Sequence, residues 1–302
     1  MSDRAQQFEQ HRARLSGVAY RMLASRADAE DVVQDAYLRW HRAESGEIRS
    51  SEAWLVTTVT RLCIDRLRQA RIEREAYVGP WLPEPLVRSE SPPADAPTEL
   101  ASSLSVAFLV VLERLSPEER AAFLLHEVFD SSYEEIAQIL GKSEVACRQI
   151  VSRARKRVKE DRPRVEVSAE ARKTLLGRFV QAVMAGDKES LIQVLAKDAT
   201  WTADGGGKAK AAHKILHGAE QVAGFLTGVL RKSLDQIRLL EITVNEEPGL
   251  AIYHADHLVA VMSFVTDGAH ILSVYSVLNP DKLLTVSQGD SFVRLLSEDT
   301  NE

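Results

Sequence analysis

The side chains best suited to binding another molecule are cationic and gather near residue 150. Residues 148–164 carry eight Arg and Lys side chains against two acidic ones, although the whole chain has a net charge of −6. Basic side chains along one helix bind the phosphates of nucleic acid, and local charge matters more for this than net charge. Residues 166–302 hold 13 basic and 18 acidic side chains, so most of the acidic excess lies away from the cationic segment.

The segment SSYEEIAQILGKSEVACRQIVSRARKRVK (131–159) predicts a helix-turn-helix that ends in this cationic segment. Gly141 is expected to form the turn and Ser143 to cap the second helix. The expected inward positions are Ile136, Ala137 and Leu140 on the first helix and Val145, Ala146, Ile150 and Val151 on the second. That register turns polar and basic side chains outward, where a recognition helix meets base edges and phosphates. The candidate DNA contacts are Ser143, Glu144, Arg148, Gln149, Ser152, Arg153, Arg155, Lys156 and Arg157.

The elements around this segment divide the chain into helical parts and one mixed part. Apolar spacing predicts helices over most of 5–75, with Asp28 capping one and Ser50 or Ser51 capping another at roughly 52–74. Residues 79–97 hold six prolines and no apolar period, which predicts a semi-rigid linker. Its apolar cluster Trp81-Leu82-Pro83 is expected to be covered by another part of the protein. Residues 100–160 are again helical, and helices followed by punctuated strands after 168 predict an α+β domain.

Composition excludes several classes of protein. No apolar run is long enough to span a membrane, and the polar N-terminus lacks the apolar stretch of a signal peptide. Cys63 and Cys147 are far apart, which fits a reducing cytoplasm and buried thiols better than a disulfide framework. We therefore expect a cytoplasmic protein with no metal site and no cofactor.

Several blocks of the chain resemble extracytoplasmic-function sigma factors. DAEDVVQDAYLRWHR and AWLVTTVTRLCIDRLRQAR resemble the σ2 domain of that family, and LSPEERAAFLLHEVFDSSYEEIAQILGKSEVACRQIVSRARK resembles its σ4 domain. WLPEP (81–85), DGGGK (204–208) and NPDKL (279–283) resemble the subgroup with a fused SnoaL-like C-terminal domain. The resemblance implies two all-α domains followed by an α+β cone of the cystatin-like kind. The implied ranges are σ2 1–78, linker 79–99, σ4 100–164, C-terminal domain 165–285 and tail 286–302.

The resemblance also implies partners and site residues. Core RNA polymerase and promoter DNA would be the partners, with the −35 element read by σ4 and the −10 element by σ2. The implied polymerase-binding residues are Asp28, Asp31, Asp35 and Arg39. The implied σ2 contacts to DNA are Trp54, Arg61, Arg66, Arg68 and Arg71, with Trp54 favoured as a core residue. Leu62 stands where many members have asparagine, so the contacts of that asparagine are not carried over.

The three short motifs are expected to join the C-terminal domain to the rest of the chain. The residues concerned are Trp81, Leu82, Pro83, Asp204, Gly205, Gly206, Gly207, Lys208, Asn279, Pro280, Asp281 and Lys282. The hypothesis is a built-in regulator that needs no separate anti-sigma factor and has room for an unknown small ligand.

Two other functions are compatible with parts of the chain. A cone-fold enzyme fused to a helix-turn-helix would need an acid–base pair, for which Asp204, His213, His254, Asp256 and His257 are the candidates. His254 and His257 are expected on opposite faces of one strand. A response-regulator-like activator would use the helix-turn-helix alone. Both alternatives leave the helical block at 28–42 without a function.

Overall fold

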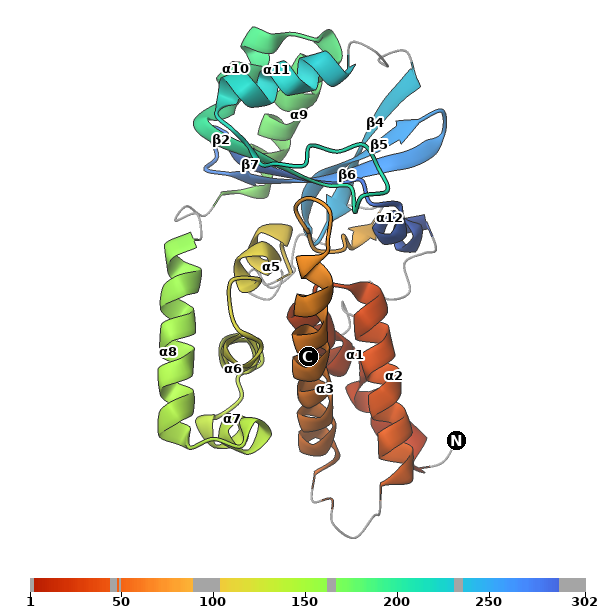
Figure 1. Ribbon diagram of the computed structural model, residues 1–302, viewed down its shortest axis with the longest axis vertical. Coiled ribbons are helices and arrows are strands. Elements are labelled where there is room, and N and C mark those ends of the chain that lie inside the picture. Colours follow the sequence, from red (N-terminus) through yellow and green to blue (C-terminus); the bar gives the residue numbers. More distant parts are fainter. Residues whose placement is uncertain are drawn as a thin grey trace.

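The computed structural model describes residues 3–43, 48, 50–88, 104–161, 167–230 and 236–287. Its first part is a bundle of α1 (Asp3–Leu23), α2 (Arg26–Arg42) and α3 (Ser51–Glu75) (Figure 1). The expected cap at Asp28 is wrong, because α2 begins earlier and the Ser25 hydroxyl accepts from the Asp28 N–H at 3.3 Å. Ser50 caps α3, and the buried face of this long helix packs on α1 and α2.

The second helical part contains the predicted helix-turn-helix. It comprises α5 (Val106–Leu112), α6 (Pro117–Glu127), α7 (Tyr133–Leu140) and α8 (Glu144–Asp161). Gly141 ends α7 in the left-handed conformation at φ +65°, and Ser143 accepts from the Ala146 N–H at 3.2 Å. One inward position was wrong: Val145 is 61% exposed, and Cys147, two residues on, is buried instead. The shift arises because the capping turn places the first turn of α8 outside the core.

The third part is a curved sheet covered by helices on one face. Its elements are α9 (Ala169–Ala185), α10 (Lys188–Val194), β2 (Leu195–Asp204), β3 (Leu216–His217), α11 (Ala219–Leu230), β4 (Ile237–Val244), β5 (Glu247–His254), β6 (His257–Thr266), β7 (Ile271–Val277) and α12 (Pro280–Ser287). The helices α9, α10 and α11 lie on the side of the sheet away from the helical parts (Figure 1). Their apolar side chains and those of the inner sheet face form one core. The predicted α+β fold is confirmed.

The linker contributes a strand to this sheet. Val87–Arg88 forms β1, which pairs antiparallel with β4 through Val87 opposite Val244 and Arg88 opposite Thr243. The strand order is therefore β1-β4-β5-β6-β7-β2-β3, with β2 and β7 parallel and the other neighbours antiparallel. Residues 79–88 are thus a docked part of the C-terminal domain. The expected semi-rigid linker is thus covered at Trp81-Leu82-Pro83, as its apolar character indicated.

The outer face of the sheet packs on the linker, on α5 and on α12. Leu82 of the linker, Val106 of α5 and Leu283 of α12 are buried together with Val244, Val261 and Val277 of the sheet. The helical parts also pack on each other, since the buried apolar side chains of α1–α3 and α5–α8 belong to one continuous cluster. The described chain therefore adopts a closed arrangement, in which α3 contacts α6 and α7 directly.

Candidate nucleic-acid interface and interdomain joint

The outward face of α8 places the predicted DNA contacts on the surface. Arg148, Gln149, Ser152 and Arg153 are exposed and line one shallow, open hollow. Arg148 is held by an ion pair with Glu144 at 2.8 Å, and its guanidinium lies 5.1 Å from the centre of the Tyr133 ring. These contacts orient the Arg148 side chain toward the solvent side of the helix. The hollow offers several donors to an acceptor-rich surface such as a base edge.

The C-terminal half of α8 is cationic but partly neutralised within the protein. Arg155 pairs with Glu127 at 2.6 Å, and Arg157 pairs with Glu119 at 2.9 Å. Burial raises the pKa of Glu119, but hydrogen bonds from Ser116 and the charge of Arg157 outweigh it and lower the pKa overall. Lys156 is 80% exposed and lies 3.9 Å from Glu160. A phosphate would therefore meet Lys156 directly, whereas Arg155 and Arg157 would have to be shared with a carboxylate.

The predicted DNA contacts of α3 are engaged within the closed chain. The Arg61 guanidinium donates to the carbonyl oxygens of Ile139 and Gln138 of α7, both at 3.0 Å. Arg68 pairs with Glu118 of α6 at 3.1 Å and with its neighbour Asp65, also at 3.1 Å. Both arginines therefore bridge the two helical parts.

The other predicted residues of α3 have different surroundings. Arg66 pairs with Asp28 at 2.8 Å and with Glu73 at 2.9 Å, whereas Arg71 is exposed. Trp54 is partly buried with its ring centre 5.4 Å from that of Trp40, as expected for a core residue.

The predicted polymerase-binding residues lie on α2. Asp31, Asp35 and Arg39 are exposed, whereas Asp28 is half-buried by its ion pair with Arg66. Asp28 therefore differs from the other three residues, because its ion pair with Arg66 holds the N-terminal end of α2 against α3.

Asp204, at the end of β2, is the centre of the joint between linker and C-terminal domain. Its carboxylate is fully buried and forms an ion pair with Lys282 at 2.7 Å. It accepts hydrogen bonds from the Tyr77 hydroxyl at 2.5 Å and the Leu82 N–H at 2.9 Å. Lys282 also donates to the Leu82 carbonyl oxygen. One carboxylate and one ammonium therefore hold the linker backbone from both sides, in the manner of charge-assisted hydrogen bonds.

Trp81 lies between two cations. The Arg74 guanidinium is 3.6 Å from the centre of the Trp81 ring, and the Lys282 ammonium is 4.1 Å from it. Burial lowers the pKa of Arg74 to about 10 and also lowers that of Lys282. Desolvated cations interact strongly with an indole ring, so Trp81 joins the end of α3 to α12.

The glycines of DGGGK allow the loop to approach its neighbours. A Cβ on Gly206, which has φ +58°, would lie 2.3 Å from the Asn279 amide nitrogen, and one on Gly205 would lie 2.6 Å from the Ala209 carbonyl oxygen. The Gly206 N–H donates to Asp204 at 3.1 Å, and Lys208 pairs with Asp281 at 2.5 Å. The loop therefore binds a carboxylate of the protein itself.

The NPDKL segment completes this joint. The Asn279 amide donates to the Tyr77 hydroxyl at 3.0 Å, and the Asn279 N–H donates to the Asp204 carbonyl oxygen at 2.9 Å. Pro280 is exposed at the first residue of α12, and Leu82 and Pro83 are buried. All three motifs thus meet in one place.

Sequence reasoning missed the residues that connect this joint to α6. Arg74 pairs with Glu113, which also pairs with Arg120 of α6 at 2.8 Å. Arg120 is buried and donates to the Met22 carbonyl oxygen of α1 at 2.6 Å. No spacing pattern in the sequence predicts such partners, because they come from helices that are far apart in the chain.

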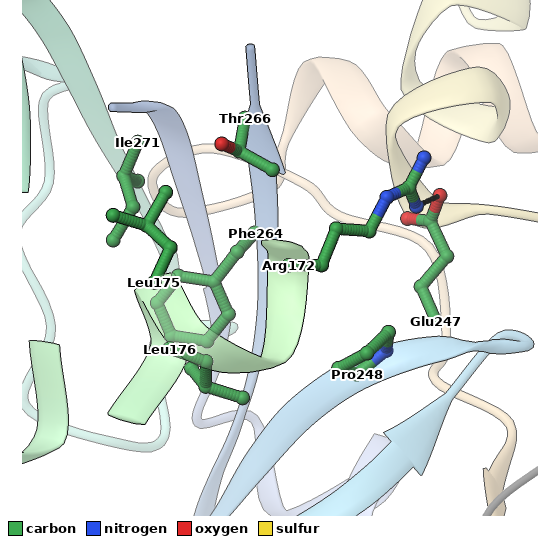
Figure 2. A pocket seen from close by; sticks show the side chains of 8 residues that line it. All are labelled: Arg172, Leu175, Leu176, Glu247, Pro248, Phe264, Thr266 and Ile271. Carbon is green, nitrogen blue, oxygen red and sulfur yellow. Dashed lines mark hydrogen bonds and ion pairs between the residues drawn. The ribbon is translucent and has the colours of Figure 1, made fainter. Parts of the chain in front are cut away.

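A small pocket opens on the inner side of the cone (Figure 2). Leu175, Leu176, Phe264 and Ile271 cluster at one side of it, and Arg172 forms an ion pair with Glu247 at the other. The candidate catalytic residues are not among the residues that line it. The expectation that His254 and His257 face opposite ways is wrong, because a turn separates them and they pair across the β5–β6 hairpin.

The described residues contain neither a membrane-crossing helix nor a metal-binding cluster. In the ranges given above, no helix is long and apolar enough to cross a membrane. In the same ranges, no group of three or more His, Cys, Asp or Glu residues could hold a metal ion.

Comparison with known proteins agrees with the sequence motifs. Family models described as "Sigma-70 region 2" and "Sigma-70, region 4" match residues 7–72 and 105–158. The chain is 37% identical to the ECF RNA polymerase sigma factor SigJ of Mycobacterium tuberculosis over 91% of its own length and 92% of that protein. It is 29% identical to the ECF RNA polymerase sigma factor SigG of M. tuberculosis, over 81% of this chain and 72% of that one.

A solved structure extends the likeness to the fold. The crystal structure of M. tuberculosis SigJ matches with a TM-score of 0.71 at 36% identity, covering 93% of this chain and 98% of that one. The match thus includes both helical parts and the sheet. The chain belongs to the ECF sigma factors of RNA polymerase, with an α+β domain at its C-terminal side.

Proposed function

We propose that the C-terminal domain regulates this sigma factor by holding σ2 and σ4 closed against each other through the linker. The observation that carries the proposal is the position of Arg61. This arginine is a candidate for holding promoter DNA, yet its guanidinium is bound to two carbonyl oxygens of α7. The same side chain cannot serve both partners at once, so closure competes with promoter binding.

The joint at Asp204 and Trp81 supports the regulatory part of the proposal. It fixes residues 77–88 to the sheet. The ion pair of Arg74 with Glu113 connects it to α3 and to the end of α5. A separate anti-sigma factor is not required if the fused domain supplies the closing contacts. The pocket of Figure 2 has room for about one water molecule, so a small ligand would bind there only by moving α9 away from the sheet.

The proposed partners are core RNA polymerase and promoter DNA, which places the protein in the cytoplasm. We assign the exposed face of α2 (Asp31, Asp35 and Arg39) to the polymerase and the arginines of α3 to the −10 element. The outward residues of α8 are assigned to the −35 element. The C-terminal domain is proposed to bind and regulate without catalysis, because the buried carboxylate of Asp204 is occupied by the linker.

Replacing Trp81 with Ala is expected to raise transcription. It removes both cation–ring contacts, each worth roughly 0.5–2 kcal/mol, so the closed arrangement should lose about 1–4 kcal/mol. That difference corresponds to roughly 5- to 800-fold in the ratio of open to closed molecules. The measurement is run-off transcription with core polymerase on a promoter obtained by selection from genomic DNA. Trp81→Phe, which keeps a ring between the cations, is the matched control.

A second variant guards against an effect peculiar to Trp81. Gly206→Ala places a methyl group against Asn279 at a left-handed position and should act in the same direction. Transcription at the unsubstituted level from both variants, with unchanged circular dichroism, would contradict the proposal.

Two arginines of α8 are expected to affect DNA binding differently. Arg148→Ala should reduce discrimination at one base pair of the −35 element by about 1–3 kcal/mol, because a base contact is lost. Arg157→Ala should weaken binding to all sequences alike and reduce the salt slope by at most about 0.9, the value for one phosphate contact, because Arg157 is shared with Glu119. Equilibrium binding of the holoenzyme to matched and single-mismatch promoters over a range of salt tests both. Equal effects on every sequence from both variants would refute this division.

A further inference from the structure

The turn between β4 and β5 contains a side chain that no motif of the chain predicts. Asn245 and Glu246 connect the strands with φ values of +51° and +65°. A two-residue hairpin with both residues in the left-handed region favours asparagine at its first position. Turn geometry alone would therefore account for the residue type, and an exposed Asn245 would need no other explanation.

Asn245 is instead 1% exposed, and its side-chain amide binds three other parts of the chain. Its Oδ1 accepts from the N–H of Leu86 in the linker at 3.0 Å. Its Nδ2 donates to the Tyr20 hydroxyl of α1 at 2.7 Å and to the Leu104 carbonyl oxygen at 2.8 Å. Both amide hydrogens are thus used, and the Asn245 N–H adds a fourth bond to the Leu86 carbonyl oxygen at 2.8 Å.

The partners Tyr20 and Leu104 are each held in place by further contacts in their own part of the chain. Tyr20 is fully buried, and its hydroxyl donates to the Glu84 carbonyl oxygen at 2.7 Å. Burial raises the pKa of this hydroxyl, so it remains a neutral donor and acceptor. Leu104 directly precedes Ser105, whose hydroxyl caps α5 by accepting from the Phe108 N–H at 3.2 Å. A movement of the hairpin tip is thus transmitted to α1, to the linker and to the first helix of σ4.

We propose that Asn245 is a positioning residue that couples the C-terminal domain to σ2 and σ4 at the same time. The Asp204 joint reaches σ4 through the ion pairs of Arg74 and Arg120 with Glu113, whereas the Asn245 amide bonds directly to Leu104 at the beginning of σ4. This inference rests on the proposed function, in which closure of σ2 on σ4 regulates transcription. It adds the residue through which displacement of the cone releases both domains.

The chain supplies a matched control at the other end of β5. Ala255 and Asp256 form a second two-residue turn with φ values of +46° and +66°, and both residues are exposed. Glycine fits either turn, so Asn245→Gly and Ala255→Gly change the backbone alike and differ only in the contacts of the lost side chain. Asn245→Asp keeps the acceptor for Leu86 and removes both donors. Tyr20→Phe removes one partner without changing a turn.

The experiment measures closure and transcription on the full chain. Spin labels on cysteines introduced at the exposed positions Gln34 of α2 and Lys159 of α8 report the separation of σ2 and σ4, since both native cysteines are buried. Hydrogen exchange of the α5 amides reports release of σ4. Because two or more buried hydrogen bonds are lost, α5 exchange should accelerate about tenfold or more in Asn245→Gly and Asn245→Asp. Tyr20→Phe should give a smaller change, and Ala255→Gly none.

The outcomes separate this inference from the proposed function. A wider label distance and faster α5 exchange in Asn245→Gly, with Ala255→Gly unchanged, support the coupling role. If Asn245→Gly keeps the distance and exchange of the unsubstituted chain, Asn245 is a turn residue only and the inference is overturned. A wider distance without altered run-off transcription supports the coupling and contradicts regulation by closure. Should Asn245→Gly fail to fold, the additivity of Tyr20→Phe and Asn245→Asp decides, because independent effects would overturn the coupling.

Discussion

Replacing Asp204 with Ala is expected to lower the free energy of unfolding by about 3–5 kcal/mol, because it removes the carboxylate that pairs with the buried ammonium of Lys282. The Tyr77 hydroxyl and the Leu82 N–H lose their acceptor in the same step. Urea unfolding followed by circular dichroism measures the loss. The double variant Asp204→Ala/Lys282→Met should recover part of it, since the ammonium is removed together with the carboxylate. A double variant no more stable than Asp204→Ala would contradict this account.

The stability of the Asp204→Ala variant should also depend on pH in a characteristic way. Burial already lowers the pKa of Lys282 in the folded protein, and loss of the Asp204 charge lowers it further. The unfolded chain then binds more protons than the folded one at pH values between the lowered pKa and the ordinary value of 10.5, so stability rises with pH there. The difference in the free energy of unfolding between the variant and the unsubstituted chain should therefore become smaller as the pH is raised toward 10.5.

Replacing Arg120 with Met is expected to cost about 3 kcal/mol and to loosen σ4 from σ2. Arg120 joins α6 to the Met22 carbonyl oxygen of α1, and its side chain is 3% exposed. Burial lowers its pKa to about 9, and Glu113 supplies a carboxylate that pairs with this buried cation. The substitution leaves the Met22 carbonyl oxygen buried without its donor, which adds to the cost. The measurements are urea unfolding and the spin-label distance between α2 and α8.

The exposed Arg178 of α9 offers a control for the Arg120 variant. Arg178→Met removes the same charge from the surface and should change stability by less than about 0.5 kcal/mol. An Arg120→Met protein as stable as Arg178→Met, with an unchanged label distance, would show that the buried arginine does not hold the two domains together.

Local signals predicted the helix-turn-helix and the class of the C-terminal domain well. Gly141 and Ser143 act within one turn of the chain, so their roles can be read from neighbouring residues. The cap at Asp28 and the burial of Val145 were wrong because each depends on where a helix begins, which Ser25 and Ser143 decide. The apolar character of Trp81 correctly indicated that another surface covers the linker.

The interdomain contacts were beyond sequence reasoning for a physical reason. Asn245 meets Tyr20 across 225 residues, and Arg61 meets Ile139 across 78. Such pairs depend on how whole domains pack, and neither partner has an unusual local setting. The motif segments could be grouped only through family resemblance. The contacts of Tyr77, Arg74 and Arg120 became evident only in the three-dimensional structure.

The β1 strand changes what counts as a module in this protein. Val87 and Arg88 complete an edge of the sheet whose remaining strands come from residues 195–277, so the cone shares its border strand with the linker. A graft of the C-terminal domain alone onto another sigma factor would expose the end of β4, and unpaired strand edges invite association between chains. The transferable unit is therefore discontinuous and comprises residues 77–88 together with the cone. Recombination or design that follows only the order of domains along the chain would separate β1 from the other strands of this sheet.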